Sequence, residues 1–372
     1  MGTTDKIAQI GEAAEAALQG AILSPERAAS FLNDAGPEVA QALRSAASRI
    51  TERFHGRRIR LFAPLYYANV CVNNCPYCGF RRENRDARRR VLAPEEIEEE
   101  AVALLGMGHR RILLVASEDP SRQGRELELE AVRRVRAARA NGQGVEQIGI
   151  EVAPGEAERF RNLAAAGVDS YLLFQETYDR RLYALVHPDG PKSDFDWRLG
   201  APERALTAGI PHVGLGILLG LGDPLEEMLA VIAHAHQIKG GVGRWPRTIS
   251  LPRMEPAVGS ELSRHPYREV SDEQLLRMIG VIRIALPWVG VVLSARERAE
   301  FRDRALDWGI TEMSAGSRTE PGGYTAREGG ALAQFEVQDH RNLDSVAAVL
   351  RARGYDPYTG GDPRPMRQPA LS

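Results

Sequence analysis

The sequence predicts an α/β protein built on a (β/α)8 barrel, or TIM barrel, with a helical N-terminal extension and a short C-terminal extension. From residue 59 onward, short apolar runs that do not alternate with polar residues are separated by amphipathic helical segments. This pattern is typical of parallel strands that are covered on both faces. Eight such units between residues 57 and 320 match the size of one barrel. A doubly wound open sheet is the alternative fold.

The elements follow one another in a regular order. Residues 1–56 are Ala-rich and have a helical pattern, so they form the N-terminal extension. The barrel, residues 57–320, contains eight candidate strands, at residues 59–65, 111–117, 147–153, 170–176, 212–220, 248–254, 289–296 and 312–318. The C-terminal extension, residues 321–372, ends in a Pro- and Gly-rich segment that we expect to be loosely held.

The composition excludes several classes of protein. With 43% hydrophobic and 26% charged residues, the chain is an ordinary globular protein. Its formal net charge of -2 gives no excess of basic residues for binding nucleic acid. The longest strongly apolar run, residues 213–222, is far shorter than the roughly 20 residues of a membrane helix. Because the first residues also lack the apolar core of a secretory signal, we expect a cytoplasmic protein with no nucleic-acid or membrane partner.

The basic residues are strongly biased toward arginine. The only lysines are Lys6, Lys192 and Lys239. A chain rich in Arg and Ala is typical of a GC-rich genome, so this bias by itself predicts no charge-recognition function.

The three cysteines give the most specific signal in the chain. Cys71, Cys75 and Cys78 directly follow the first predicted strand, and chemistry in a TIM barrel belongs at such strand ends. An odd number of cysteines in one loop favours metal ligation over a disulfide framework. Three thiolates can bind three irons of a [4Fe–4S] cluster and leave the fourth iron open. Zinc would need a fourth ligand, and the nearest histidines, His55 and His109, lie at no motif spacing.

The cysteine spacing resembles the signature of radical S-adenosylmethionine (SAM) enzymes. The segment reads Cys71-x3-Cys75-Pro-Tyr77-Cys78. The resemblance implies one [4Fe–4S] cluster, ligated by these three cysteines, whose open iron binds SAM, with Tyr77 lining the adenine site. It also implies that reduction by an electron donor such as flavodoxin or ferredoxin yields a 5′-deoxyadenosyl radical, which abstracts a hydrogen atom.

A wider resemblance covers about residues 59–356. The segments FQETYD, HPDGPK, TISLPR and SAGSRTEPGGY are similar to those of radical SAM aromatic amino acid lyases. This family includes the thiazole-synthesis tyrosine lyase (2-iminoacetate synthase), the [FeFe]-hydrogenase maturase tyrosine lyase and the tryptophan lyase that forms 3-methyl-2-indolic acid. The maturase has further cysteines near its C-terminus, whereas this sequence has none after Cys78, so we do not expect a complete maturase of that type.

The resemblance also implies residues that hold the substrate. Arg296 corresponds to an arginine that binds the substrate carboxylate, which suits a planar guanidinium. Ser314 resembles a substrate-binding serine of the tryptophan enzyme, and Tyr66 resembles a tyrosine near the substrate. The alternative for Arg296 is an ion pair with Glu297 or Glu300 at the surface.

Further candidates for binding SAM lie near other strand ends. Glu118 follows the second strand, where its carboxylate would accept hydrogen bonds from the SAM ammonium group or would cap a helix. Gln175 and Glu176 end the fourth strand, with Arg180 just beyond it and Arg253 at the end of the sixth. We expect these side chains to contact the ribose or the carboxylate of SAM.

The leading hypothesis is a lyase that cleaves the Cα–Cβ bond of L-tyrosine to 2-iminoacetate (dehydroglycine) and 4-cresol. A second hypothesis is that L-tryptophan or another aromatic amino acid is the substrate. It is motivated by Arg247, which stands where the maturase has a histidine just before the TISLPR segment. A third, a non-catalytic iron–sulfur protein, is disfavoured because an electron carrier has no use for an open iron. The oligomeric state stays open.

Overall fold

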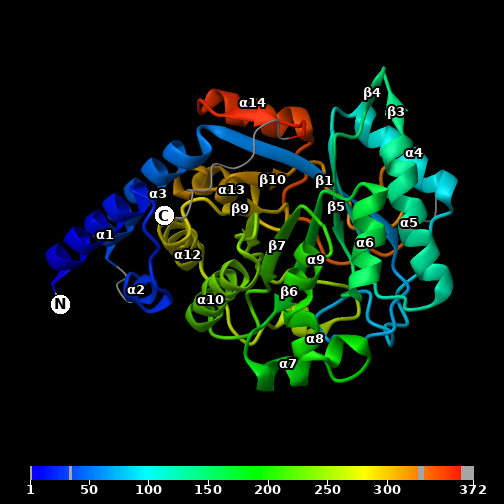
Figure 1. Cartoon of the computed structure of the whole chain (residues 1–372), viewed down its shortest axis with the longest axis horizontal. Helices are drawn as coiled ribbons and strands as arrows, with labels where there is room; N and C mark the ends of the chain where they lie inside the picture. The colour runs from blue at the N-terminus through cyan, green and yellow to red at the C-terminus, as the bar shows by residue number, and fades with distance from the viewer. Residues whose placement is uncertain (1, 33–35, 326–330, 362–372) are drawn as a thin grey trace.

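Eight parallel strands close into a barrel (Figure 1). The computed structural model describes residues 2–32, 36–325 and 331–361. Each strand pairs with the next, and β10 returns to pair with β1 from Arg60–Glu312 to Phe62–Ser314, which closes the sheet and confirms the predicted barrel. In order round the barrel, the strands are β1 (Arg58–Ala68), β2 (Arg111–Ala116), β5 (Gln147–Glu151), β6 (Ser170–Glu176), β7 (His212–Ile217), β8 (Thr248–Ser250), β9 (Gly290–Leu293) and β10 (Glu312–Ser314).

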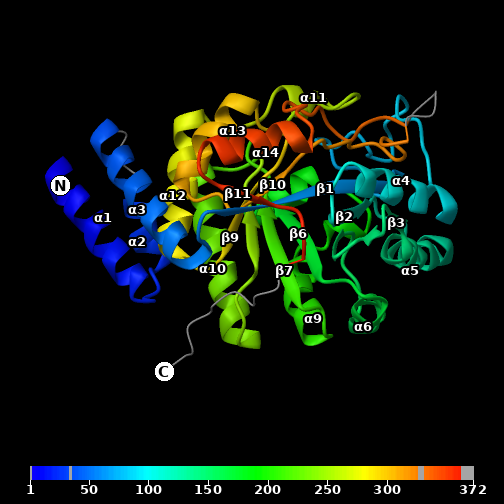
Figure 2. The same ribbon diagram turned by 90° about the horizontal axis from the view of Figure 1, so that it is seen from above.

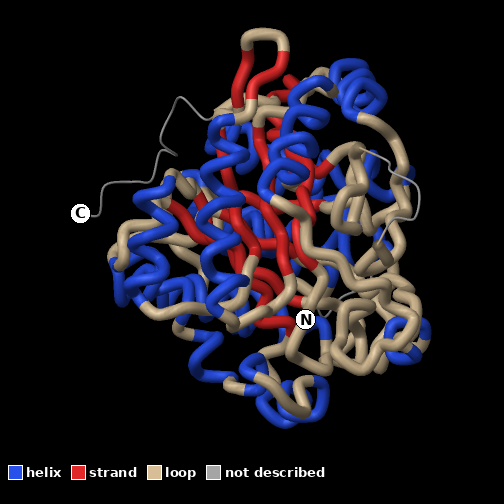
Figure 3. Tube along the Cα trace, turned by 90° about the vertical axis from the view of Figure 1, so that its right-hand side faces the viewer, coloured by secondary structure: helices blue, strands red, loops and turns tan. Residues whose placement is uncertain are grey.

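Helices cover the outer face of the strands, as Figure 3 shows. The alternation along β5 explains this burial on both sides. Ile148 and Ile150 point outward and are fully buried in the main hydrophobic core, while Gln147 and Gly149 line a cavity inside the barrel. The covering helices are α4 (Pro94–Gly106), α5 (Arg122–Ala137), α6 (Ala157–Ala166), α9 (Ala201–Thr207), α10 (Pro224–Val242), α12 (Asp272–Ala285) and α13 (Ala299–Ala305). The connections also contain the helical segments α7 (Arg180–Val186), η1 (Pro191–Ser193), α8 (Phe195–Leu199), α11 (Glu261–Arg264) and η2 (Leu306–Trp308).

The N-terminal residues form three helices beside the barrel. They are α1 (Thr3–Leu18), α2 (Pro25–Ser30) and α3 (Pro37–His55). Ser24 caps α2 by accepting a hydrogen bond from the Arg27 amide, and Pro25 occupies the first helical position. Figure 2 shows these helices on the side of the barrel opposite α4, α5 and α6. None of the helices in the described part of the chain combines the length and the apolar character needed to cross a membrane.

The segment after β10 contacts both ends of the barrel. Its residues 331–341 cross the carboxyl-terminal mouth, where the Gln334 carbonyl accepts a hydrogen bond from the Gly79 amide and the Gln338 amide donates to the Ala295 carbonyl. The chain then forms α14 (Leu343–Ala352) and β11 (Asp356–Tyr358). β11 pairs in parallel with the first residues of β1, so this part is held by the sheet and is not loose as expected. Residues 326–330 and 362–372 of the predicted extension lie outside the described residues.

Candidate active site

Two adjoining cavities lie at the carboxyl-terminal ends of the barrel strands. The first, of about 110 Å³, lies at the end of β1 beside the cysteine loop, and we call it the cysteine cavity. The second, of about 80 Å³, lies inside the mouth of the barrel, and we call it the barrel cavity. Tyr66, Val115 and Glu151 line both. The two cavities therefore share part of their walls.

The cysteine loop is held by hydrogen bonds from several distant segments. The Cys78 amide donates to the Cys75 carbonyl at 3.1 Å, which turns the loop back on itself. The Ser260 hydroxyl donates to the Pro76 carbonyl at 2.6 Å. The Phe80 amide lies 3.4 Å and the Gln334 amide nitrogen 3.7 Å from the Cys78 sulfur. All three cysteines line the cysteine cavity, as the spacing predicts.

The three thiols suit a cluster better than a single metal ion. Burial raises the pKa of Cys75 to about 12 and also raises the pKa of Cys78, so these two thiols stay protonated at neutral pH without a metal. A bound metal deprotonates such thiols. Among the described residues, no three His, Cys, Asp or Glu side chains are arranged round one ion, as zinc requires. In a [4Fe–4S] cluster each cysteine binds a different iron, which this donor set can provide.

Glu176 and Lys192 form an ion pair in the wall of the cysteine cavity. Lys192 Nζ lies 2.7 Å from Glu176 Oε1, and both side chains are nearly buried. The register of β6 with β7 shifts between Phe174 and Glu176, and Glu176 has a φ of 71°, which is rare for a residue other than glycine. Glu176 thus lies at an irregular end of β6, where it lines the cysteine cavity. Sequence reasoning missed Lys192, although its rarity as one of three lysines was a usable signal.

Asn73 joins the cysteine loop to two other segments. Its amide nitrogen donates to Glu118 Oε2 at 2.7 Å, and its Oδ1 accepts from the Lys192 amide at 2.9 Å. Gly190, with a φ of 79°, permits this approach, since a Cβ there would lie 2.4 Å from Asn73 Oδ1. Glu118 thus lines the cysteine cavity as predicted, with one oxygen already bound to Asn73.

Tyr77 is fixed by a buried histidine. Its hydroxyl lies 2.7 Å from His187 Nε2, while His187 Nδ1 lies 2.9 Å from the Tyr183 carbonyl. Burial lowers the pKa of His187 to about 2, so the ring is neutral. A neutral ring that donates from Nδ1 to the carbonyl accepts a hydrogen bond from the Tyr77 hydroxyl at Nε2. Tyr77 therefore stands at a fixed angle beside Cys75 in the cysteine cavity.

Arg296, Ser314 and Tyr66 all line the barrel cavity. The Arg296 guanidinium stacks at 3.4 Å over the ring of Phe335, and no carboxylate of the described chain forms an ion pair with it. The alternative of an ion pair with Glu297 or Glu300 is thus absent from this arrangement. The Ser314 hydroxyl accepts from the Ala295 amide at 2.9 Å.

Three other predicted residues lie away from both cavities. The Gln175 amide nitrogen is 3.5 Å from the Phe195 carbonyl. Arg180 is exposed and pairs with Asp196. Arg253 pairs with Glu297 and with Asp272, and it lines a separate surface cleft. These side chains are engaged by neighbours, so the structure does not bring them to the predicted site.

A polar floor lies beneath the barrel cavity. A smaller cavity there is lined by Arg111, Gln147, Ser170 and Glu312, and it shares apolar wall residues with the barrel cavity, namely Phe62, Leu113, Leu172 and Val292. Arg247, which replaces the maturase histidine, belongs to this floor, because its Nε lies 3.6 Å from Glu312 Oε1.

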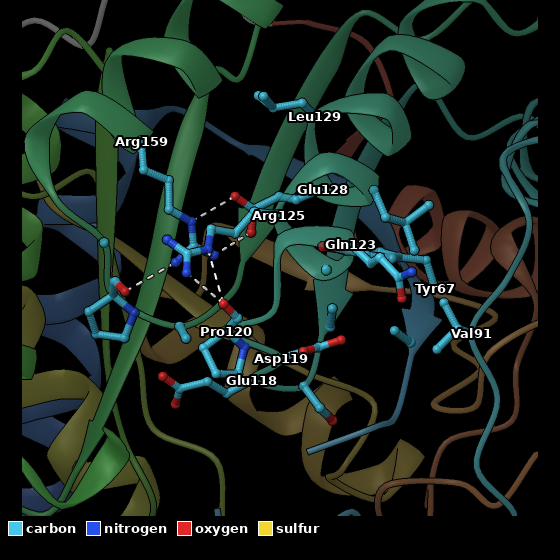
Figure 4. Close-up of a pocket in the computed structure, with 18 of the residues that line it drawn as sticks. Tyr67, Val91, Glu118, Asp119, Pro120, Gln123, Arg125, Glu128, Leu129 and Arg159 are labelled. Carbon is cyan, nitrogen blue, oxygen red and sulfur yellow. Dashed lines mark hydrogen bonds and ion pairs between the residues drawn. The ribbon is translucent and has the colours of Figure 1, made fainter. Parts of the chain in front are cut away.

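A large cleft, of about 950 Å³, lies outside the barrel between α5 and α6 (Figure 4). Its central charges are paired with neighbours. Arg159 binds Glu128, with Nε 2.9 Å from Oε1, and Arg125 donates to the Pro120 carbonyl at 2.6 Å. Glu118 lines both this cleft and the cysteine cavity, and Figure 4 shows it below the paired arginines. The cleft thus borders the site without containing the cysteines.

Comparison with known proteins agrees with this arrangement. Residues 65–235 match the family described as the Radical SAM superfamily, and residues 250–356 match the Biotin and Thiamin Synthesis associated domain. The chain is 33% identical to 2-iminoacetate synthase from Salmonella typhimurium, covering 92% of this chain and 88% of the relative. The chain belongs to the radical SAM superfamily. As a radical SAM enzyme it is homologous to 2-iminoacetate synthase, and the family implies a [4Fe–4S] cluster and SAM.

Solved structures extend the comparison. The crystal structure of HydG, a maturase of the [FeFe]-hydrogenase, superposes with a TM-score of 0.90 at 37% identity, covering 95% of this radical SAM enzyme and 76% of that chain. Methylornithine synthase (PylB) superposes with a TM-score of 0.74 at 23% identity, which shows the shared fold. These matches confirm the predicted radical SAM barrel.

Proposed function

We propose that this radical SAM enzyme cleaves the Cα–Cβ bond of L-tyrosine and releases 2-iminoacetate and 4-cresol. The observation that carries the proposal is the shared wall of Tyr66, Val115 and Glu151 between the cysteine cavity and the barrel cavity. A radical formed on one side of this wall has only a short path to a substrate on the other, and short, fixed paths favour hydrogen transfer over side reactions.

In this proposal the cysteine cavity holds the cofactors. Cys71, Cys75 and Cys78 would hold the cluster, and SAM bound beside it would supply the 5′-deoxyadenosyl radical when the cluster is reduced. Glu118 and the Glu176–Lys192 pair provide charges for the amino and carboxylate groups of SAM, and Tyr77 borders its adenine. A small reductant protein such as flavodoxin or ferredoxin donates the electrons.

The barrel cavity holds the amino acid. Arg296 binds the substrate carboxylate through its planar guanidinium, with Ser314 and Tyr66 beside it. Loss of a hydrogen atom from the amino group leads to cleavage of the Cα–Cβ bond into 2-iminoacetate and a 4-hydroxybenzyl radical. That radical takes up one electron and one proton to become 4-cresol.

The polar floor supports tyrosine as the substrate. An aromatic ring that points down from Arg296 passes between Leu113, Leu172 and Val292 toward the floor. Gln147 and Ser170 there offer hydrogen-bonding groups to a phenol hydroxyl. A site built to bind a hydroxyl discriminates strongly against a ring that lacks it, because its buried polar groups are then left unpaired.

Anaerobic turnover of the reconstituted protein with tyrosine, tryptophan and phenylalanine tests the proposal. We expect 4-cresol from tyrosine, identified by mass spectrometry, together with 5′-deoxyadenosine and with glyoxylate from hydrolysis of 2-iminoacetate. Cleavage of tryptophan without cleavage of tyrosine would overturn the tyrosine assignment and favour the second hypothesis. Formation of 5′-deoxyadenosine that no aromatic amino acid stimulates would overturn the lyase proposal itself.

A further inference from the structure

Glu151 occupies the wall between the two cavities. It is the last residue of β5 (Gln147–Glu151), and the alternate residues Gln147, Gly149 and Glu151 all line cavities within the barrel. Glu151 lines both the cysteine cavity and the barrel cavity. It is the only carboxylate that the described residues place on both.

The Glu151 carboxylate has no partner. Within residues 2–32, 36–325 and 331–361, it makes no hydrogen bond or ion pair, whereas Glu118 binds Asn73 and Glu176 binds Lys192. Glu151 is partly buried at the edge of both cavities, and a carboxylate that faces a cavity without donors of its own is free to bind a donor that a ligand brings.

The charges round Glu151 come from every side of the cavity. Lys192 of η1, Arg198 of α8 and Arg296 after β9 lower its pKa, while Glu176 of β6 raises it. Glu151 in turn raises the pKa of Tyr66 on β1, whose hydroxyl donates to Gln334 Oε1 at 2.8 Å. Burial is the largest effect, and together these influences raise the pKa of Glu151 to about 7. Near neutral pH the carboxylate is therefore able both to accept and to release a proton.

We propose that Glu151 binds the α-ammonium group of the amino acid substrate and accepts one of its protons before hydrogen-atom transfer. This inference rests on the proposed function, because it assumes that Arg296 holds the substrate carboxylate. The carboxylate of the zwitterionic substrate then meets the Arg296 cation, and its ammonium group meets the Glu151 carboxylate, in the same cavity. The step is balanced: an ammonium group and a carboxylate become an amine and a carboxylic acid, one N–H bond breaks, one O–H bond forms, and no electrons are transferred.

The chemistry of the amino group requires such an acceptor. A hydrogen atom is removed more readily from a neutral amine than from an ammonium group, whose nitrogen has no lone pair to stabilise the radical. The amino group of a free amino acid is protonated at neutral pH, so the protein has to take up that proton. Arg296 and Lys192 are cations and cannot serve, and Glu118 and Glu176 are already bound. Glu151 is the carboxylate that fits both the position and the chemistry.

The test compares Glu151→Gln with Glu158→Gln, which changes an exposed glutamate on the neighbouring helix α6. Calorimetry on the unreduced, SAM-loaded protein measures binding of L-tyrosine and of its deamino analogue, 3-(4-hydroxyphenyl)propionate, without turnover. The parent and Glu158→Gln should prefer tyrosine. Glu151→Gln should lose about 10-fold or more of that preference, as expected for a charge-assisted hydrogen bond. The affinity of each protein for SAM is measured in the same way, and that of Glu158→Gln should match the parent.

The pH dependence provides a second readout. Glu151 accepts a proton only when ionised, so tyrosine cleavage by the parent should rise as the pH increases through about 7. Glu151→Gln should be slower and should lack this rise. Glu151→Asp, which keeps the carboxylate, should retain the preference for tyrosine over the deamino analogue at a reduced rate, and thermal unfolding of each variant verifies that it folds.

Two results would overturn the inference. One is a Glu151→Gln protein that folds and still distinguishes tyrosine from its deamino analogue as the parent does. The other is weaker SAM binding with unchanged discrimination, which would place Glu151 on the cofactor. If the parent cleaves tryptophan and not tyrosine, the same comparison is made with tryptophan and indole-3-propionate. Failure of the tyrosine proposal is thereby distinguished from failure of the proposed role of Glu151.

Discussion

The guanidinium of Arg296 lines the barrel cavity and stacks on the ring of Phe335. We predict that Arg296→Lys weakens the apparent affinity for the amino acid about 10- to 100-fold, or roughly 1.4–2.8 kcal/mol, because lysine keeps the charge but loses the planar fork. The dependence of 5′-deoxyadenosine formation on tyrosine concentration measures this. Slow SAM cleavage without substrate should persist. A variant that binds and cleaves tyrosine like the parent would contradict the carboxylate assignment.

The cysteines allow one cluster in the chain. We predict about four irons per reconstituted protein, since three thiolates ligate a single [4Fe–4S] cluster. Cys75→Ala should abolish both the cluster absorbance and 5′-deoxyadenosine formation, whatever the substrate. Iron analysis and electron paramagnetic resonance provide the measurement. About eight irons with a second set of signals would show that a second cluster is present.

At the residue scale, the sequence predicts which side chains reach the site from the ends of strands. It does not predict those that reach the site from irregular segments. Tyr66, Glu118 and Arg296 each follow or end an apolar run, so their place at the mouth is predictable from the barrel alone. Lys192 and Gln334 reach the cysteine cavity from a 3-10 turn and a loop, whose paths follow no periodic pattern. Glu151 was predictable in position, but only the structure reveals that its carboxylate lacks a partner.

The positions of the strands along the sequence were mostly predictable, whereas their lengths were less so. The candidate strands at 248–254, 289–296 and 312–318 shorten to β8, β9 and β10, each of which ends earlier. The apolar run continues past each strand because the mouth loops also pack against buried side chains. β11 was missed, since three residues that include Pro357 carry no strand pattern, and it forms only because β1 extends beyond β2.

Glu312 of β10 anchors the floor of the barrel. Burial by itself would raise its pKa, but Arg111, Arg247 and Arg60 outweigh burial and lower it. We predict that Glu312→Ala lowers the free energy of unfolding by roughly 3–5 kcal/mol, because buried arginines lose their shared carboxylate. Urea unfolding at pH 7 measures the change. Glu273→Ala, at an exposed glutamate, is the control, and equal stability of the two variants would show that the arginines do not depend on Glu312.

On the scale of the whole molecule, buried histidines make stability depend on pH. Burial lowers the pKa of His109, His212 and His234 to about 4 each. The unfolded chain, with histidine pKa values near 6.5, binds protons more readily, so stability is greatest above about pH 6.5 and falls as the pH drops toward 4. Each histidine contributes a slope of up to about 1.4 kcal/mol per pH unit in that window.

Urea unfolding of the parent between pH 7.5 and 5 measures this slope. His234→Gln, at a position where Nδ1 lies 2.8 Å from the Tyr178 hydroxyl, should reduce the slope by the share of one histidine. A midpoint that stays constant over this range would contradict the prediction. His265→Gln, at an exposed histidine, should leave the slope as it is in the parent.

At this scale, the division of the chain into a barrel and two extensions is also a proposal. We propose an extension over 1–56, a barrel over 57–320 and a second extension over 321–372. The barrel was predictable because eight apolar runs repeat at a spacing that only a covered parallel sheet explains. The path of residues 331–341 across the mouth was not predictable from the sequence. That segment has neither a helical nor a strand pattern, and contacts with three distant loops hold it in place.

The contact between Gln334 and Cys78 joins positions that are 256 residues apart. Chains emerge from the ribosome N-terminus first, so the cysteine loop exists long before the residue that closes over it. The side chain that contacts Cys78 from across the mouth is thus made after the cysteine loop, while Cys71 and Cys78 stay partly exposed in the finished fold. The order of synthesis therefore leaves Cys78 without its Gln334 contact until residue 334 has been made.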